Sequence, residues 1–583
     1  MNPPAEQVFE SKEQLLISIQ QYALAHGYAI TTVSSSRDRN ITLGCDRGGY
    51  YHDRVDAPDR AKRRRTSTKR IGCPFRLYAK RLENNQWEFK VRNPTHNHEA
   101  DDNMIGHPIA RRRQFTKDSI QTIQHLSNIG SKPQHIISLI RKQQPQILIK
   151  PKDCYNIRDE LRRKRLGNYT PLEFLRESLQ TNDWRYAFKQ DTEGHILFFM
   201  FAHPKSIQYA NQYNRVFLLD CTYKTNRYKM PLLHIIGLSP SNSSFSIAFC
   251  FMQNEQEESY KWTLQTFFSW LNPSPFPPVL CTDRDLALLG AIKSIYPKSP
   301  HLLCVWHINK NVLAKTKQYF SSNEEFEAFI QSWKSLINSS TTIEYQDQLA
   351  KFETRFSLTP AALRYVKQTW LTYKEMFIRA WVGQYLYLGN WATSRVEGSH
   401  AILKKYIGGS TGDILFVFER INNALEAQHY TLSSDLAEDQ IKTLNFCSHF
   451  LYSNITKRTS RYSLRLIYEQ AAIAKRATPE ALLSKCTNIF TRTMGLPCAH
   501  RIASLLSTYQ PIPLSDIHQF WRIGLGNKES EYLPILNPLI PLPPARKSNH
   551  DTKSSVQKIT KKKAPSKCTN CGEIGHTIRS CRV

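Results

Sequence analysis

The sequence predicts a mixed α/β core joined to a helical block, with small units rich in cysteine and histidine on both sides. Between residues 196 and 310, short apolar runs of strand length alternate with segments of helical period. This alternation is typical of a sheet that is covered by helices. Residues 311–390 then show helical periodicity with many aromatic side chains, and cysteines and histidines at metal-ligand spacing occur before and after these segments.

The individual elements follow from the spacing of apolar residues. We expect strands at residues 196–201, 216–219, 232–238, 245–251, 279–281 and 302–306. Within the core, helical period predicts helices at residues 260–271 and 287–295. The helical block is expected to contain helices at residues 326–337, 345–356 and 361–382.

The charge and composition restrict the function. The 583-residue chain has a formal net charge of +30, which indicates a polyanionic partner such as nucleic acid, although a solvated basic surface is the alternative. No apolar run reaches the about 18 residues that a membrane-spanning helix needs, and the first residues lack a signal-peptide pattern. We therefore expect neither membrane insertion nor secretion. In such a chain, 13 cysteines favour metal sites over disulfides.

Two segments before the core are candidates for nucleic-acid contacts. Residues 59–70 form a dense basic stretch, which predicts a nuclear-import signal, a phosphate-contacting arm or simply an exposed charged loop. Residues 115–165 have the periodicity of two short helices, with Gly130 and Pro133 at the break and a basic segment at 158–165. This pattern indicates either a helix-turn-helix-like unit or an ordinary helical hairpin.

Two aspartates occupy positions typical of a site for divalent cations. Asp220 follows the apolar run 216–219 and Asp283 follows 279–281, so each is expected at the end of a buried strand. A carboxylate there is costly unless something binds it. Two-metal cleavage of a phosphodiester needs such carboxylates on a rigid sheet. Asp285 is an alternative to Asp283, and a strand-end aspartate is often only a turn residue or a helix cap.

A third acid begins a predicted helix. Glu397 lies in the segment SRVEGSH, and the helix is expected to continue through residue 406. His400 and Lys404 follow Glu397 by three and seven positions, so the three side chains should share one helix face. A cation beside the carboxylate would hold a DNA phosphate.

Four segments carry a resemblance to a known family. They are FLLDCTYKTNRYKMPLL, CTDRDLALLGAI, HLLCVWHINKNV and SRVEGSHAILKKYI. They closely resemble the transposases of Mutator-like elements (MULEs), whose relatives include the plant far-red-impaired-response regulators, which are domesticated transposases. The resemblance covers most of residues 200–410. It implies an RNase H-like core with two Mg²⁺ or Mn²⁺ ions, a DDE triad of Asp220, Asp283 and Glu397, and an all-helical insertion between the second and third acids.

The same family has a Cys-x-x-His element after the second acid, and Cys304 and His307 match it here. The resemblance implies a role next to the active site, either in touching DNA or in joining a metal site. The alternative is a buried cysteine and a packed histidine that close a strand. Two ligands alone do not complete a zinc site.

The end of the chain carries a complete set of four zinc ligands, Cys568, Cys571, His576 and Cys581. So small a unit would draw most of its folding free energy from Zn²⁺. It resembles a retroviral-type zinc knuckle, which implies binding of single-stranded nucleic acid. The usual stacking positions hold no aromatic residue, so a protein contact is the alternative.

A second candidate zinc site contains Cys45, Cys73, His96 and His98, with a strand-like pattern between Cys73 and His96. It resembles the WRKY–GCM type of DNA-binding zinc domain found at the front of MULE relatives. The resemblance implies a zinc-stapled sheet that inserts an edge strand into the major groove of DNA.

The third candidate, formed by Cys486, Cys498 and His500, resembles a SWIM zinc finger. The usual SWIM pattern has Cys-x-Cys before Cys-x-His, but Asn488 occupies the place of the second cysteine. Either another residue supplies the fourth ligand or the site is degenerate, and Cys447 and nearby histidines are candidates. The sequence therefore predicts two to three structural zinc sites.

The predicted organisation has eight parts. They are a WRKY–GCM-like zinc domain at 1–105, a helix-turn-helix-like segment at 110–170, the first part of the RNase H-like core at 180–310, the helical insertion at 311–390, the last part of the core at 391–440, a helical region with the SWIM-like finger at 441–530, a Pro-rich and basic linker at 531–566, and the zinc knuckle at 567–583.

The resemblance implies a nuclear DNA transposase that binds terminal inverted repeats and carries out metal-dependent strand cleavage and strand transfer. Its expected partners are double-stranded DNA, single-stranded nucleic acid at the knuckle and further copies of itself, without a membrane. One alternative is a domesticated, sequence-specific transcription regulator without catalysis. A nuclease or RNA-processing RNase H relative is a second alternative, which the helical insertion and the three zinc units disfavour.

Overall fold

The computed structural model describes residues 1–36, 39–50, 68–274, 277–390, 394–477 and 486–523. The expected zinc knuckle, the Pro-rich linker and most of the basic stretch 59–70 lie outside these residues. Among the helices of the described ranges, none is long and apolar enough to cross a lipid bilayer.

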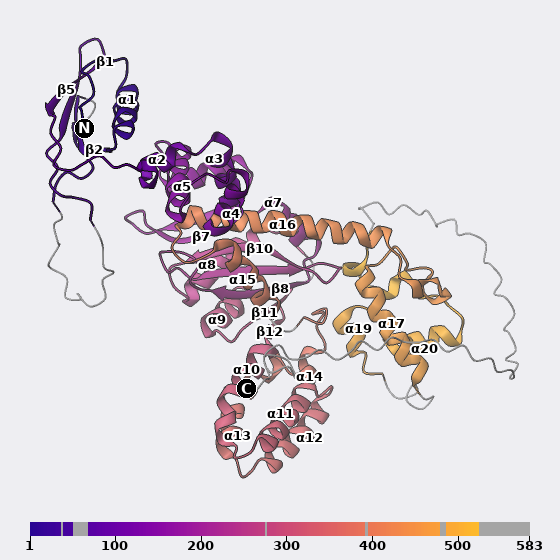
Figure 1. The fold of residues 1–583 in the computed structure, drawn as a ribbon. Helices are drawn as coiled ribbons and strands as arrows, with labels where there is room; N and C mark the ends of the chain where they lie inside the picture. Colours follow the sequence, from indigo (N-terminus) through magenta and orange to yellow (C-terminus); the bar gives the residue numbers. More distant parts are fainter. Residues whose placement is uncertain (37–38, 51–67, 275–276, 391–393, 478–485, 524–583) are drawn as a thin grey trace, which may run out of the picture. The chain divides into compact units, whose positions relative to one another are not determined.

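The N-terminal unit is an antiparallel sheet of five strands in the order β1-β5-β4-β3-β2 (Figure 1). Its elements are β1 (Val8–Phe9), α1 (Lys12–Ala25), β2 (Ile30–Ser36), β3 (Asn40–Cys45), β4 (Arg76–Arg81) and β5 (Trp87–Asn93). Helix α1 buries Leu15, Ile19 and Ala23, which are spaced at helical period, in the core of this unit. Strand β2 forms one edge, and every residue of it after Ile30 is exposed.

A unit of short helices follows, formed by the 3₁₀ turn η2 (Met104–Gly106), α2 (Pro108–Arg113), α3 (Lys117–Asn128), α4 (Pro133–Gln143) and α5 (Pro151–Leu166). Ile123, Ile136 and Ile157 are buried in its own small core. The predicted break is confirmed, because Gly130 has a positive φ of 89° between α3 and α4 and Pro133 is the first residue of α4.

A mixed sheet of seven strands forms the centre of the core, in the order β12-β11-β8-β9-β10-β7-β6 (Figure 1). The strands are β6 (Arg185–Gln190), β7 (Ile196–Ala202), β8 (Val216–Thr222), β9 (Leu232–Leu238), β10 (Ser244–Met252), β11 (Val279–Thr282) and β12 (His301–Leu303). Strands β8, β11 and β12 are parallel, whereas β9, β10, β7 and β6 continue the sheet in antiparallel pairs. Strand β6 and the helix α7 (Pro204–Gln212) are not among the elements that the apolar pattern predicts.

Helices cover both faces of this sheet. Neighbouring residues of a strand point to opposite faces, so Phe198 and Met200 of β7 belong to one core while Phe199 and Phe201 belong to the other. Helices α8 (Glu257–Ser269) and α9 (Leu286–Ile295) pack on the first face. On the second face lie α6 (Pro171–Thr181), α15 (Ser394–Ile407) and the first half of α16 (Ile414–Ile441).

The register of the parallel strands places their carboxyl ends side by side. Leu218 of β8 pairs with Cys281 of β11, and Thr282 of β11 pairs with Leu303 of β12. Asp220 and Asp283 each follow their paired residue by two positions, so the register puts both aspartates at the same end of neighbouring strands.

The helical block between β12 and α15 has its own core around Trp333. Its elements are α10 (Val305–Thr316), η3 (Lys317–Tyr319), α11 (Asn323–Asn338), α12 (Thr342–Arg355), α13 (Pro360–Thr369), η4 (Leu371–Met376) and α14 (Arg379–Val382). The single helix expected at 361–382 is wrong, because the backbone leaves the helical conformation at Tyr373 (φ −109°, ψ 18°). The strand expected at 302–306 is too long, since β12 ends at Leu303 and α10 begins at Val305.

The last described part of the chain is helical. After α16 come η5 (Asn445–Ser448), η6 (Phe450–Tyr452), α17 (Arg461–Arg476), α19 (Ile489–Met494), α20 (Ala499–Ser507), η7 (Leu514–Asp516) and η8 (Gln519–Trp521). Helices α17 and α20 pack together through Leu464, Ile467 and Ile502, which are buried.

Candidate active site and metal-ligand clusters

Asp220, Asp283 and Glu397 line one pocket of about 460 Å³ at the carboxyl end of the parallel strands. The two aspartates come from β8 and the end of β11, and Glu397 comes from the first turn of α15. Helix α15 contacts β8 and β10, which brings the glutamate over the ends of the strands. The structure thus brings together three acids that are far apart in the sequence.

The electrostatics of the pocket show that these carboxylates are close to one another. Burial, together with the negative charges of Asp283 and Glu397, raises the pKa of Asp220 to about 7 against the opposing effect of His307. Burial also raises the pKa of Asp283. Because like charges that are held together repel, this arrangement favours the binding of cations.

His307 lies inside the pocket, and its Nε2 atom is 3.2 Å from a carboxylate oxygen of Glu397. Burial opposes a charge on this imidazole, but the Cys304 thiol and the carboxylates of Asp220 and Asp283 together raise its pKa to about 9. Cys304 itself is buried and caps α10, where its sulfur accepts a hydrogen bond from the His307 amide at 3.5 Å. The Cys-x-x-His pair therefore stands at the junction of β12 and α10, where the buried Cys304 follows the strand directly and caps the helix.

His400 and Lys404 line the same pocket as Glu397, so the three residues share one face of α15. The Nδ1 atom of His400 is 3.8 Å from a carboxylate oxygen of Asp220, and its side chain is 9% exposed. Among the residues that the structure describes, Lys404 is the one lysine that lines this pocket. Lys404 therefore lies where the sequence predicts a positive charge near Glu397.

Asp285 differs from Asp283 in its hydrogen bonding. Its side chain caps α9 and accepts a hydrogen bond from the Leu288 amide at 2.7 Å. The strand has ended at Thr282, so both aspartates lie in the connection between β11 and α9. Asp285 therefore acts as a helix cap at the edge of the pocket.

The sequence patterns did not single out three further pocket residues, Tyr223, Glu255 and Tyr260. The hydroxyl of Tyr223 donates a hydrogen bond to Glu255 at 2.7 Å, and that of Tyr260 donates to the same oxygen at 3.3 Å. Glu255 stands in an acidic, polar turn before α8, where spacing gives no indication of a site.

The pocket fits divalent metal ions by its donor set. Carboxylate oxygens are the ligands that Mg²⁺ and Mn²⁺ prefer, and several of them converge here within a cavity. Burial is the main cause of the raised pKa of Asp220, and the nearby charges of Asp283 and Glu397 add to it, so a bound cation would stabilise the ionised carboxylates.

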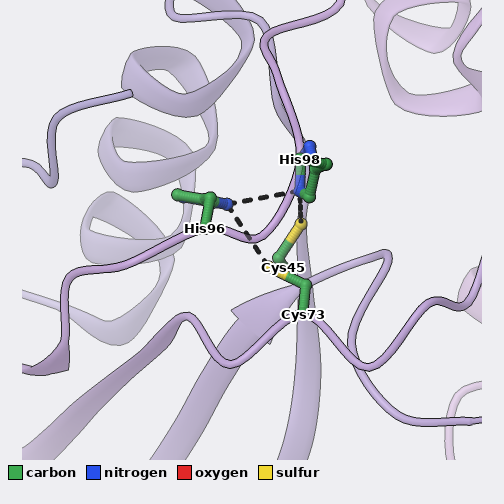
Figure 2. A group of neighbouring side chains, drawn as sticks. All are labelled: Cys45, Cys73, His96 and His98. Carbon is green, nitrogen blue, oxygen red and sulfur yellow. Dashed lines mark hydrogen bonds between the residues drawn. The ribbon is translucent and has the colours of Figure 1, made fainter.

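Four ligand atoms from Cys45, Cys73, His96 and His98 form a compact cluster in the N-terminal unit, all within 4.8 Å of one another (Figure 2). The sulfur of Cys45 lies 3.3 Å from His98 Nε2. The sulfur of Cys73 lies 3.4 Å from His96 Nδ1. A tetrahedral zinc site with bonds of about 2.0–2.3 Å separates its ligand atoms by roughly 3.3–3.8 Å. The His98 Nδ1 atom lies at hydrogen-bond distance, 2.8 Å, from the carbonyl oxygen of Glu99. The other ring nitrogen, Nε2, is therefore available to bind a metal. The cluster fits zinc.

Cys486, Cys498 and His500 form a second cluster, of three ligands. The two sulfurs are 3.7 Å apart, which also suits a shared zinc ion. Cys447 does not belong to this cluster. Among the described residues, only the three side chains named above bring their ligand atoms within 4.8 Å of one another here. The Asn488 amide oxygen is 3.4 Å from the Cys486 sulfur, at the place where the usual pattern has a cysteine.

Two ranges of the chain match known domain families. Residues 216–311 match the MULE transposase domain, a range that includes Asp220, Asp283, Cys304 and His307 and ends before Glu397. Residues 19–102 match the FAR1 DNA-binding domain, a range that includes all four ligands of the N-terminal cluster. These matches define a transposase-related protein. In particular, the chain carries a MULE transposase domain and a FAR1 DNA-binding domain and is related to the Mutator-like transposases and the FAR1 family.

Similar individual proteins include members of that family from Arabidopsis thaliana. The chain is 25% identical to Protein FAR1-RELATED SEQUENCE 5 over 72% of its own length and 54% of that protein. It is 22% identical to Protein FAR-RED IMPAIRED RESPONSE 1 over 68% of its own length and 49% of that protein. It is also 22% identical to the PKS-NRPS hybrid synthetase cheA of Chaetomium globosum, over 89% of this chain but 12% of that protein. The chain thus spans about half of the plant relatives and a small part of the synthetase.

Proposed function

We propose that this protein is a DNA transposase of the Mutator-like type, which binds terminal inverted repeats and catalyses strand cleavage and strand transfer. The observation that carries the proposal is the convergence of Asp220, Asp283 and Glu397 in one pocket. Parallel strands next to an antiparallel extension, with helices on both faces, support an RNase H-like core. The separate core of the block between β12 and α15 supports a helical insertion.

Each pocket residue has a role in this proposal. Asp220, Asp283 and Glu397 would hold two Mg²⁺ or Mn²⁺ ions, which would activate the attacking oxygen and stabilise the leaving oxygen. His307 orients Glu397 through its contact with the carboxylate, and the cap at Cys304 fixes the start of the helix that carries His307. Lys404 lies on the exposed side of the pocket, where its ammonium group would contact a DNA phosphate.

The N-terminal unit would recognise the ends of the element. Its four-ligand cluster would hold a structural zinc ion that fixes the sheet. The edge strand β2 offers six consecutive exposed residues, which suits insertion into the major groove of DNA. We assign the second zinc ion to the SWIM-like cluster and a third to the knuckle, which lies outside the described residues.

The proposal includes the cellular setting. A net charge of +30 favours binding to double-stranded DNA, at the terminal repeats and at the target. Cleavage of two ends within one complex requires a homo-oligomer, and action on chromosomal DNA requires entry into the nucleus. Single-stranded nucleic acid would bind at the knuckle.

The deciding experiment is a strand-transfer assay with purified protein, a pre-cleaved inverted-repeat end and Mg²⁺. Joined product with the wild-type protein, and none with Asp283→Asn, is the expected result. The alternative function is a domesticated transposase that regulates transcription by sequence-specific DNA binding without catalysis, which the resemblance to the FAR1 family favours. Tight binding of the repeat without cleavage or joining by the wild-type protein would establish that alternative and refute ours.

A further inference from the structure

The loop between β8 and β9 begins three residues after Asp220 and carries an unusual set of side chains. We call residues 223–229, with the sequence YKTNRYK, the β8–β9 loop. Its first residue, Tyr223, lines the carboxylate pocket. The loop is therefore at the entrance of the candidate active site, although neither the metal sites nor the N-terminal unit accounts for its composition.

Buried polar residues hold this loop in one conformation. Thr225 and Asn226 are almost inaccessible, with exposed fractions of 0% and 1%. The Asn226 side chain accepts a hydrogen bond from the Met230 amide at 3.1 Å and donates one to the Met230 carbonyl at 2.8 Å. The Arg227 amide donates to the carbonyl of Gly412 at 2.9 Å, which ties the loop to the segment before α16. A loop fixed in this way can position a ligand without first being ordered.

Two lysines of the loop have a backbone conformation that lysine rarely adopts. Lys224 and Lys229 have φ angles of 59° and 60°, in the left-handed region where glycine or asparagine costs less free energy. Such strain persists where the surrounding structure enforces it and is concentrated at functional sites. The presence of lysine at both strained positions therefore indicates a use for the side chains.

The exposed side chains of the loop combine positive charge with aromatic rings. Lys224 and Lys229 are exposed and make no ion pair with a described carboxylate, whereas Arg227 pairs with Asp413 at 2.6 Å. Tyr223 and Tyr228 are about half exposed, with exposed fractions of 51% and 54% for the whole residues. Free cations beside exposed rings are typical of surfaces that follow a nucleic-acid strand and stack on its bases.

Of the two tyrosines of the loop, Tyr223 is the one that lines the carboxylate pocket. Its hydroxyl is fixed by the hydrogen bond to Glu255, so the ring stands at the entrance of the pocket in a defined orientation. A strand whose phosphate reached the three acids would pass this ring with the adjacent nucleotide.

We infer that the β8–β9 loop binds the DNA strand next to the scissile phosphate, with Lys224 and Lys229 on backbone phosphates and the Tyr223 ring stacked on an unpaired base. The inference rests on the proposed function, because the carboxylate pocket defines where the scissile phosphate lies. It goes further by assigning a single-stranded DNA contact to residues outside the acidic triad.

Binding of a DNA end by the 583-residue chain tests the two lysines. The measurements use the catalytically inactive Asp283→Asn background, so that the substrate stays intact. In the Lys224→Asn/Lys229→Asn variant, asparagine tolerates the left-handed backbone and the loop should keep its shape. The slope of log affinity against log salt should become shallower by about 1.4–1.8, as expected for two lost phosphate contacts. A Lys293→Gln variant, changed at an exposed lysine of α9, should keep the slope of the background protein. An unchanged slope in the double variant would refute the phosphate contacts.

Fluorescence of 2-aminopurine, placed in an unpaired extension beside the cleavage position, tests the stacking. Quenching on binding should be retained in Tyr223→Phe, which keeps the ring but loses the bond to Glu255, and lost in Tyr223→Leu. The affinity for this probe should fall roughly 5- to 100-fold with leucine, as is typical for one stacked base. Tyr430→Leu, at an 80% exposed tyrosine of α16, is the matched control. Normal quenching in Tyr223→Leu would overturn the inference, whereas joining by Asp283→Asn would instead refute the proposed function.

Discussion

The imidazole of His307 lies 3.2 Å from the carboxylate of Glu397, although ninety positions separate the two residues in the sequence. This contact joins the first turn of α10 to the first turn of α15 at the entrance and exit of the helical block. It therefore connects the block to the pocket in which the three acids meet.

Removal of the His307 imidazole should weaken the metal binding that we propose for Glu397. In His307→Ala we expect strand joining and Mn²⁺ affinity to fall by about 10- to 100-fold, as is typical when a residue that orients a metal ligand is lost. Joining kinetics and a Mn²⁺ titration followed by electron paramagnetic resonance measure the two effects. His307→Gln retains a hydrogen-bond donor and should lose less of both. Equal losses in the two variants would show that the contact with Glu397 does not matter.

Substitutions should show that Asp283 is catalytic and that Asp285 is structural. Asp285→Ala removes the cap of α9 and should lower the free energy of unfolding by about 1 kcal/mol, while Asp285→Asn keeps an acceptor and most of the stability. Asp283→Asn should abolish joining without a loss of stability, because it relieves repulsion between carboxylates. Urea unfolding and the joining assay test both statements. The reverse pattern would make Asp285 the catalytic acid.

Zinc should hold the N-terminal unit together. In Cys73→Ser we expect one fewer equivalent of bound zinc, unfolding of the five-stranded sheet and loss of DNA binding. Elemental analysis, circular dichroism and a binding assay measure these changes. Cys154→Ser alters a buried cysteine that is outside both clusters and should retain all the zinc. Full zinc content in Cys73→Ser would exclude the proposed site.

The SWIM-like cluster should bind metal more weakly than a site with four protein ligands. Replacing Asn488 by cysteine supplies a thiolate close to Cys486, and we expect Co²⁺ to bind at least about tenfold more tightly. The visible absorption of Co²⁺ should then report a third thiolate ligand. Asn488→Ser serves as the control that adds no sulfur. No gain with cysteine would mean that another group already fills the fourth position.

Asp413 should make the core sensitive to acid. Burial raises the pKa of this carboxyl, but the Phe416 amide and the guanidinium groups of Arg162 and Arg227 outweigh burial and hold the pKa below its ordinary value. The stabilisation is thus complete above the pKa of an unfolded aspartate and is lost as the pH falls through the lower, folded value.

Asp413→Asn should therefore lower the free energy of unfolding by about 1.5–3 kcal/mol at neutral pH, because charged hydrogen bonds are lost. The difference from the wild-type protein should be constant above about pH 5 and should shrink as the pH falls further, through the pKa of an unfolded aspartate and then the lower, folded value. Urea denaturation at several pH values measures it. A difference that is constant with pH would show that the charge of Asp413 contributes nothing.

Local patterns in the sequence determined much of the core. Apolar runs before Asp220 and Asp283 correspond to β8 and β11, because burial on both faces of a sheet requires consecutive apolar residues. Helical spacing likewise placed Glu397, His400 and Lys404 on one face of α15. The break of the helix expected at 361–382 escaped prediction, since its apolar spacing continues across Tyr373 and only the packing of the block shows the kink.

The sequence by itself determined which residues are acids at strand ends, which cysteines and histidines have ligand spacing, and where most of the central strands run. The tertiary structure alone decided that Glu397 meets Asp220 and Asp283, that Glu255 and Tyr223 join them, and that Cys447 stays away from the SWIM-like cluster. The physical reason is that spacing along a chain reports which side chains are buried. Strand register and helix packing, which set the distances between remote residues, arise only from contacts across the whole fold.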